Sequence, residues 1–144
     1  MPPIDVVSDA SVVLGWFHED GEEQVADSRS ILAAHQDETI AVAVLDLTAY
    51  EVGNALLRGR VRATATQVAT VLESISQICP AVSPDIGDLR LAAELAEREG
   101  LTLYDAAYAA VAQRRGALLV TLDRKLLAAG VGRSPREAVA QLIT

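Results

Sequence analysis

The sequence predicts an α/β protein in which helices pack on a layered, parallel β-sheet. Short runs of Val, Ile and Leu alternate along the chain with longer segments of helical periodicity, and this alternation is typical of parallel β-α units. The chain has 144 residues, of which 51% are hydrophobic, which suits one domain with a full core. No internal repeat, low-complexity segment or linker interrupts the pattern. We therefore expect a single domain over residues 1–144.

The expected elements follow from apolar periodicity and from the residues that end each segment. Four short apolar runs predict strands, at 6–9, 39–45, 81–84 and 117–121. Periodic segments predict helices at 11–17, 22–36, the segment around Glu51 up to Gly59, 65–78, 85–100, 104–116, 122–130 and 134–143. Pro80 stops the fourth of these helices, and Gly100 and Gly116 close the fifth and sixth.

Composition excludes several classes of protein. The net charge is −8, so nucleic-acid binding through global positive charge is excluded, and a nucleic-acid role would need a local basic patch or bound cations. The single cysteine, Cys79, cannot form an internal disulfide or a cysteine-based zinc module, and we expect it in the core.

The start of the chain lacks the features of a signal peptide, and the longest apolar run, 40–45, is too short to span a bilayer. These features predict a cytoplasmic protein with no membrane association. A mean hydropathy of +0.25 favours a partner chain that covers part of its apolar surface.

The stretch TAYEVGNALLRG (48–59) places a carboxylate, Glu51, in a helix that is otherwise apolar. On a 3.6-residue period most of this helix reads as buried, including Tyr50 and Leu57 on its flanks. The stripe left for solvent contains Thr48, Glu51, Asn54 and Arg58. A partly buried carboxylate needs a charged partner, protonation or a metal ion. An ion pair with Arg58 is the structural alternative.

Three more carboxylates are expected at the same edge of the sheet as Glu51. Asp9 and Asp123 lie just past the carboxyl ends of two strands, where parallel sheets place their ligand sites. Asp105 opens the alanine-rich helix. Taken singly, these three aspartates could each be a helix N-cap. Together with Glu51 they would form a quartet of acids that cannot all stay ionised without a cation.

An all-oxygen acidic site suits Mg²⁺ or Mn²⁺. Such ions activate water and polarise phosphate groups, which fits phosphodiester hydrolysis. We expect Asp9 and Asp105 to be the main metal ligands, with Glu51 and Asp123 completing the site directly or through water. Asn54, one turn beyond Glu51, is expected beside them.

The sequence resembles PIN-domain ribonucleases, and more specifically the toxins of VapBC-type toxin–antitoxin pairs. The resemblance rests on VVSDASVVLGWF (6–17), TAYEVGNALLRG (48–59), TLYDAAYAAVAQRRGALLVT (102–121) and TLDRKLL (121–127), which span nearly the whole chain in the order typical of the family. It implies a three-layer α/β/α sandwich with a short parallel sheet and Mg²⁺- or Mn²⁺-dependent cleavage of RNA. It also implies inhibition by a cognate antitoxin, and homodimers are common among such domains. Position by position, Asp9, Glu51, Asp105 and Asp123 match the acidic quartet of the family. Ser11 and Thr121 match positions where a small hydroxyl residue supports the site.

Basic residues are candidates for contacts with RNA phosphates. Arg58, Arg60 and Arg62 cluster after the Glu51 helix, Arg124 and Lys125 follow Asp123, and Arg114 and Arg115 close the Asp105 helix. The alternative for each group is a set of helix-end cations that complement the helix dipole. Two histidines, His18 and His35, are expected at the surface. Trp16 and Phe17 are expected in the core, with an apolar groove for a partner as the alternative.

Two other functions are compatible with these residues. A Mg²⁺-dependent phosphohydrolase or phosphoacceptor domain would use an aspartyl nucleophile and a positioned lysine, for which Lys125 could serve. However, the stretch that follows Asp9 lacks a second acid two residues on. A non-catalytic PIN-fold binding module is the other alternative, and the intact quartet argues against it.

Overall fold

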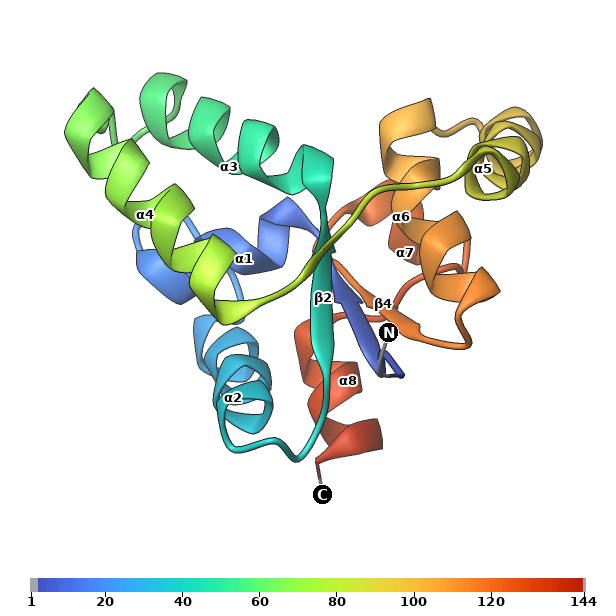
Figure 1. The fold of residues 1–144 in the computed structure, drawn as a ribbon, viewed down its shortest axis with the longest axis horizontal. Coiled ribbons are helices and arrows are strands. Elements are labelled where there is room, and N and C mark those ends of the chain that lie inside the picture. The colour runs from blue at the N-terminus through green and yellow to red at the C-terminus, as the bar shows by residue number, and fades with distance from the viewer. Residues whose placement is uncertain (1–2, 144) are drawn as a thin grey trace.

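A computed structural model of the chain describes residues 3–143 and shows four parallel strands with helices on both faces (Figure 1). The strands are β1 (Val6–Ser8), β2 (Val42–Leu45), β3 (Ala81–Val82) and β4 (Leu118–Val120). Their order in the sheet is β3-β2-β1-β4. Val6 pairs with both Val42 and Leu118, so β1 and β2 lie in the middle of the sheet. All four expected strands are present, although each is shorter than its apolar run.

Eight helices are found in the described residues, one for each helix expected from the sequence. They are α1 (Ala10–Phe17), α2 (Val25–Gln36), α3 (Asp46–Arg58), α4 (Ala65–Ile78), α5 (Ile86–Glu99), α6 (Leu103–Arg114), α7 (Arg124–Ala128) and α8 (Pro135–Leu142). Local signals fix several of their ends. Thr64 and Ser134 form capping boxes that start α4 and α8, and Gly100 ends α5 in the left-handed region at φ +67°.

The two central strands, β1 and β2, are buried on both faces, and successive strand residues contribute to two separate cores. Val7 and Leu119 pack with α5, α6 and α7 on one side of the sheet. Val6 and Val120 pack with α1, α2, α3, α4 and α8 on the other. The period of two along a strand explains this division, because neighbouring side chains point to opposite faces. The arrangement is the three-layer α/β/α sandwich that the family resemblance implies.

Core predictions for single residues are confirmed. Trp16 and Cys79 are buried in the core on the α1–α4 side of the sheet, and Phe17 packs against it while partly exposed. Within residues 3–143 no helix has both the length and the apolar character needed to cross a membrane.

The prediction that α3 is buried on nearly every side is wrong. Tyr50 is 81% exposed and Leu57 is 40% exposed, whereas Thr48, expected on the solvent stripe, is fully buried. The reason is that α3 packs against α1, α4 and the sheet, while no helix of residues 3–143 lies over its outer flank (Figure 1). Apolar residues on that flank therefore face solvent.

Candidate active site

The four predicted acids line one cavity at the carboxyl edge of the sheet. The cavity has a volume of about 170 Å³ and is lined by Asp9, Ala10, Ser11, Glu51, Asp105, Tyr108, Leu122 and Asp123. Asp9 follows β1, Asp123 follows β4, and Glu51 and Asp105 lie in the first two turns of α3 and α6. Parallel strand ends meet at this edge, so four segments far apart in sequence contribute to one site.

Asp9 is the most enclosed of the four acids, with 6% of its surface exposed. Its carboxylate accepts hydrogen bonds from the hydroxyls of Ser11 and Thr121, both at 2.5 Å, and caps α1 through the amide of Val12. The Ser11 hydroxyl in turn accepts from the Leu122 amide at 3.0 Å. These contacts tie the end of β1 to the loop after β4. Ser11 and Thr121 thus orient Asp9, in the supporting position that the family resemblance implies.

The N-cap alternative holds for two of the three aspartates. Asp9 caps α1, and Asp123 caps α7 by accepting from the amides of Lys125 and Leu126. Asp105 is not a cap, because the Thr102 side chain caps α6 and accepts from the Asp105 amide. Its carboxylate is therefore not engaged in capping.

Glu51 accepts a hydrogen bond from the Tyr108 hydroxyl at 2.6 Å. The Tyr108 hydroxyl also contacts Thr48 Oγ1 at 2.7 Å, and Thr48 Oγ1 accepts from the Leu45 amide at 3.1 Å. Because Tyr108 donates its only hydroxyl hydrogen to Glu51, Thr48 is the donor to Tyr108. The result is a chain of donors that runs from the β2–α3 junction to the Glu51 carboxylate.

The ion pair of Glu51 with Arg58 is not found among the described residues. Sequence reasoning missed both Tyr108 and the role of Thr48. A signal for Tyr108 was available, because it lies three residues after Asp105 in YDAAY and so falls on the same face of α6.

Burial and mutual repulsion both disfavour the ionised forms of the acids in this cavity. Desolvation raises the pKa of Asp9 to about 6, against lowering by hydrogen bonds from Ser11 and Thr121, and the Glu51 charge raises it further. Desolvation also raises the pKa of Glu51, and the charge of Asp105 adds to this shift. Desolvation raises the pKa of Asp105 as well, and the charge of Asp123 adds to that shift. Burial raises the Tyr108 pKa far above its usual range, so this phenol stays a donor. An acidic site of this kind is stabilised by a cation.

Stability should respond to pH through Asp9. The pKa of this carboxyl is about 6 in the folded protein and close to its ordinary value of 3.8 when unfolded, so the folded state binds the proton more tightly between these values. The Asp9 carboxyl should therefore lower the free energy of unfolding of the metal-free protein by about 3 kcal/mol as pH rises from about 3 to about 7. Urea denaturation across this range measures the slope. Asp9→Asn should flatten it, and an equal slope in the variant would contradict the assignment.

The basic residues do not all lie at this site. Arg58, Arg60 and Arg62 lie at or beyond the carboxyl end of α3, where Arg60 approaches Asp20 at 3.9 Å. Arg58 is seven residues after Glu51, or about 10 Å along the helix. Lys125 lies close enough to the cavity to lower the pKa of Asp105, and Arg124 precedes it as an exposed residue. Contacts of these five residues with RNA remain a prediction.

Arg114 and Arg115 have structural partners. Both contact the Asp88 carboxylate, at 2.8 and 3.0 Å, and Arg114 also contacts Asp85 at 2.6 Å. These ion pairs join α6 to the start of α5. They favour the structural interpretation of this pair of arginines over phosphate binding.

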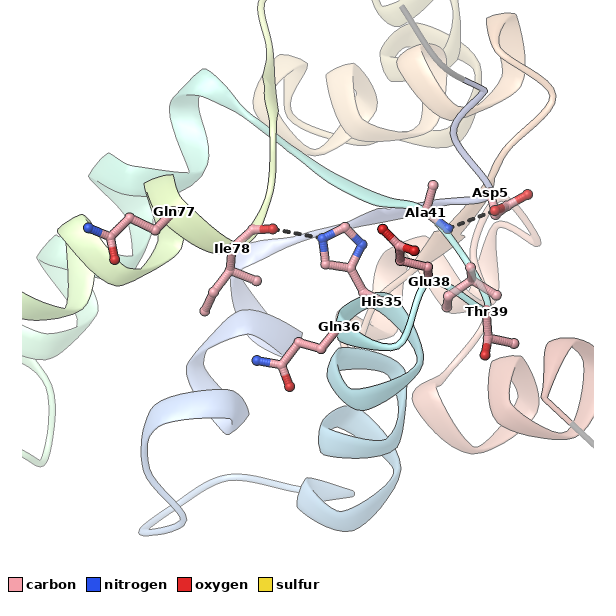
Figure 2. Close-up of a pocket in the computed structure, with 9 residues that line it drawn as sticks. Asp5, His35, Gln36, Glu38, Thr39, Ala41, Gln77 and Ile78 are labelled. Atoms are coloured by element: carbon pink, nitrogen blue, oxygen red, sulfur yellow. Dashed lines mark hydrogen bonds between the residues drawn. The ribbon is translucent and has the colours of Figure 1, made fainter.

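A larger cavity, of about 570 Å³, lies at the opposite, amino edge of the sheet (Figure 2). His35 lies on its wall with both ring nitrogens engaged, one with the Ile78 carbonyl at 2.7 Å and the other with the Val42 amide at 3.0 Å. His35 is half-buried, and its ring bridges α2, β2 and the end of α4. His18 is partly buried and lies 3.7 Å from Glu22. The cavity in Figure 2 is lined by none of the four acids.

Within residues 3–143, no group of three or more His, Cys, Asp or Glu side chains is arranged to hold a metal ion directly. The four acids share a cavity, yet the carboxylates of Asp9, Glu51 and Asp123 each accept hydrogen bonds from protein groups. The donor set is nevertheless all oxygen, and burial, to which repulsion between neighbouring acids adds, raises the pKa of Asp9, Glu51 and Asp105. It fits a hard divalent ion that takes one or two carboxylates directly and keeps several waters.

Comparisons with known proteins agree with this architecture. The PIN domain family model matches residues 6–131. A protein named exonuclease VapC9, from Pyrobaculum aerophilum, is 41% identical over 119 residues, which cover 74% of this chain and 84% of that protein. Ribonuclease VapC3 from the same organism is 35% identical over 127 residues, which cover 84% of this chain and 91% of that protein.

Solved structures show the same fold. The crystal structure of PAE2754 from Pyrobaculum aerophilum matches with a TM-score of 0.71 at 26% identity, covering 96% of this chain and 89% of that one. A chain of a toxin–antitoxin complex from Klebsiella pneumoniae matches with a TM-score of 0.67 at 16% identity, covering 91% and 98%. With the family model matching most of its length, this chain belongs to the PIN-domain family.

Proposed function

We propose that this protein is a metal-dependent endoribonuclease and the toxin of a toxin–antitoxin pair, acting in the cytoplasm. The observation that carries the proposal is the convergence of Asp9, Glu51, Asp105 and Asp123 on one cavity of a PIN domain. The curated relatives are named exonuclease and ribonuclease VapC proteins, which supports nuclease chemistry in the same fold.

In this proposal Asp9 and Asp105 hold Mg²⁺ or Mn²⁺, and Glu51 and Asp123 act directly or through water. The bound ion supplies an activated water and charge stabilisation for hydrolysis of a phosphodiester. The hydroxyls of Ser11 and Thr121 keep both oxygens of Asp9 fixed toward the site. Tyr108 holds Glu51 by its hydrogen bond. Fixed ligands reduce the reorganisation that the site needs during reaction.

A phosphoacceptor role is less well supported than hydrolysis of RNA. The residue two positions after Asp9 is Ser11 rather than a second acid.

The cleavage assay should use purified protein with linear and circular single-stranded RNA. We expect cleavage of both forms in Mg²⁺ or Mn²⁺ and no cleavage in EDTA. Cleavage of the circular form identifies an endonuclease, because only an endonuclease opens a circle. Full activity in EDTA would contradict the metal mechanism. Cleavage of linear RNA alone would be consistent with a nuclease but would contradict the assignment as an endonuclease.

The toxin assignment adds partners to the nuclease: RNA as substrate, a cognate antitoxin, and a second copy in a homodimer. An arginine or lysine of the antitoxin is expected to reach the acidic cavity, where its charge compensates the carboxylates. Expression of this chain alone should arrest growth. Co-expression of the small protein encoded beside it should restore growth, and Asp9→Asn should remove the toxicity. A chain that is harmless alone and binds no neighbouring gene product would contradict the toxin assignment but not the nuclease.

A further inference from the structure

The chain has five aromatic residues, namely three tyrosines, one tryptophan and one phenylalanine. Trp16 and Tyr108 are buried, and Phe17 packs against the core. The two that remain, Tyr50 and Tyr104, are 81% and 68% exposed. Both line the same cavity of about 380 Å³, together with Leu47, Glu51 and Asn54. All the well-exposed aromatic surface among residues 3–143 is therefore gathered at one place.

This cavity, which we call the tyrosine pocket, adjoins the acidic cavity. Glu51 lines both of them. Each tyrosine also directly precedes an acid of the quartet, Tyr50 before Glu51 and Tyr104 before Asp105. A ligand whose phosphate lies at the carboxylates would therefore place its neighbouring group in the tyrosine pocket.

The lining of the tyrosine pocket selects a flat, uncharged, aromatic ligand. Tyrosine rings stack on nucleobases of any identity, and such stacking does not require positive charge. The Asn54 amide both donates and accepts, as do the side chains that read base edges in single-stranded RNA. The acidic quartet next to the pocket and the net charge of −8 oppose affinity through phosphate contacts alone. A volume of about 380 Å³ takes a base, whereas the apolar face of a helix needs a longer groove.

We propose that Tyr50 and Tyr104 form a stacking site for an unpaired nucleobase of RNA, with Asn54 at the edge of the base. The inference rests on the proposed ribonuclease function and adds to it how the substrate is held. It predicts a preference for single-stranded RNA and for purines, which stack more strongly than pyrimidines.

The test measures binding of fluorescein-labelled oligoadenylate and oligouridylate by anisotropy. It uses an Asp9→Asn background, in which we expect no cleavage. The parent should bind oligoadenylate more tightly than oligouridylate. Tyr50→Leu and Tyr104→Leu, which keep apolar bulk but remove the ring, should each weaken oligoadenylate binding by about tenfold or more and reduce the purine preference. Tyr50→Phe and Tyr104→Phe should stay within about twofold of the parent.

Leu57→Ala is the matched control, because Leu57 is an exposed apolar residue of α3 outside the pocket. It should leave RNA binding unchanged. Leucine variants that bind both oligonucleotides like the parent would overturn the stacking site. Sedimentation of each variant tests whether a second copy of the chain occupies the tyrosine pocket. If the variants lose RNA affinity only because a dimer dissociates, the proposal is wrong. The proposed function fails separately, if the wild-type protein neither binds nor cuts RNA.

Discussion

Asp9→Asn and Asp105→Asn should each lower the rate of RNA cleavage by at least about a thousandfold while leaving the fold intact. Each substitution removes the charge of one of the two proposed main metal ligands and keeps the shape of the side chain. Asp9→Asn should also raise the melting temperature of the metal-free protein near neutral pH, because desolvation and repulsion disfavour its ionised form. Single-turnover cleavage in Mn²⁺, with circular dichroism of each variant, measures both effects.

Asp46→Asn is the control for loss of one negative charge. Asp46 is an exposed acid in the first turn of α3 that accepts a hydrogen bond from Ser83 and does not line the acidic cavity. It should cleave RNA at close to the wild-type rate. Wild-type turnover by Asp9→Asn or Asp105→Asn would remove that residue from the site.

Glu51→Gln should lower cleavage by orders of magnitude at nearly unchanged stability. The glutamine keeps the shape and an oxygen that can accept from Tyr108, so the donor chain from Leu45 survives. What it loses is the charge that attracts a cation. Cleavage rates and urea denaturation on the same preparations separate the two effects.

Glu94→Gln, an exposed glutamate of α5, is the matched control for the glutamine substitution. Both its activity and its stability should equal those of the wild type. If Glu51→Gln instead lowers stability while activity per folded molecule holds, Glu51 is a structural residue held by Tyr108. The three aspartates alone would then supply the negative charge that attracts the cation.

The convergence of the acids could be predicted from the sequence because topology determines it. Asp9 and Asp123 follow strands, and parallel strands end at a common edge whatever the details of packing. The strand residues are apolar without interruption, as in Val42–Leu45, which indicates burial on both faces and hence two layers of helices.

The tertiary partners of the site could not be predicted in the same way. The Tyr108–Glu51 hydrogen bond joins residues 57 positions apart, and it depends on the distance between α3 and α6. Periodicity along α3 also says which residues share a face but not which face another helix covers. For that reason periodicity predicts a buried Tyr50 and an exposed Thr48, and the structure reverses both. The contact of His35 with the Ile78 carbonyl likewise joins residues 43 positions apart and depends on how the end of α4 lies against α2.

The most direct test of the account is calorimetric titration of the metal-free protein with Mn²⁺, at about pH 7.5 and about pH 5. Since the pKa of Asp9 is about 6, its carboxyl is ionised at the higher pH and largely protonated at the lower, and metal competes with that proton. We predict binding at pH 7.5 that weakens markedly at pH 5 and is lost in Asp9→Asn, with Asp46→Asn like the wild type. Equal affinity for Mn²⁺ in wild type and Asp9→Asn would contradict the claim that the acidic cavity is a metal site.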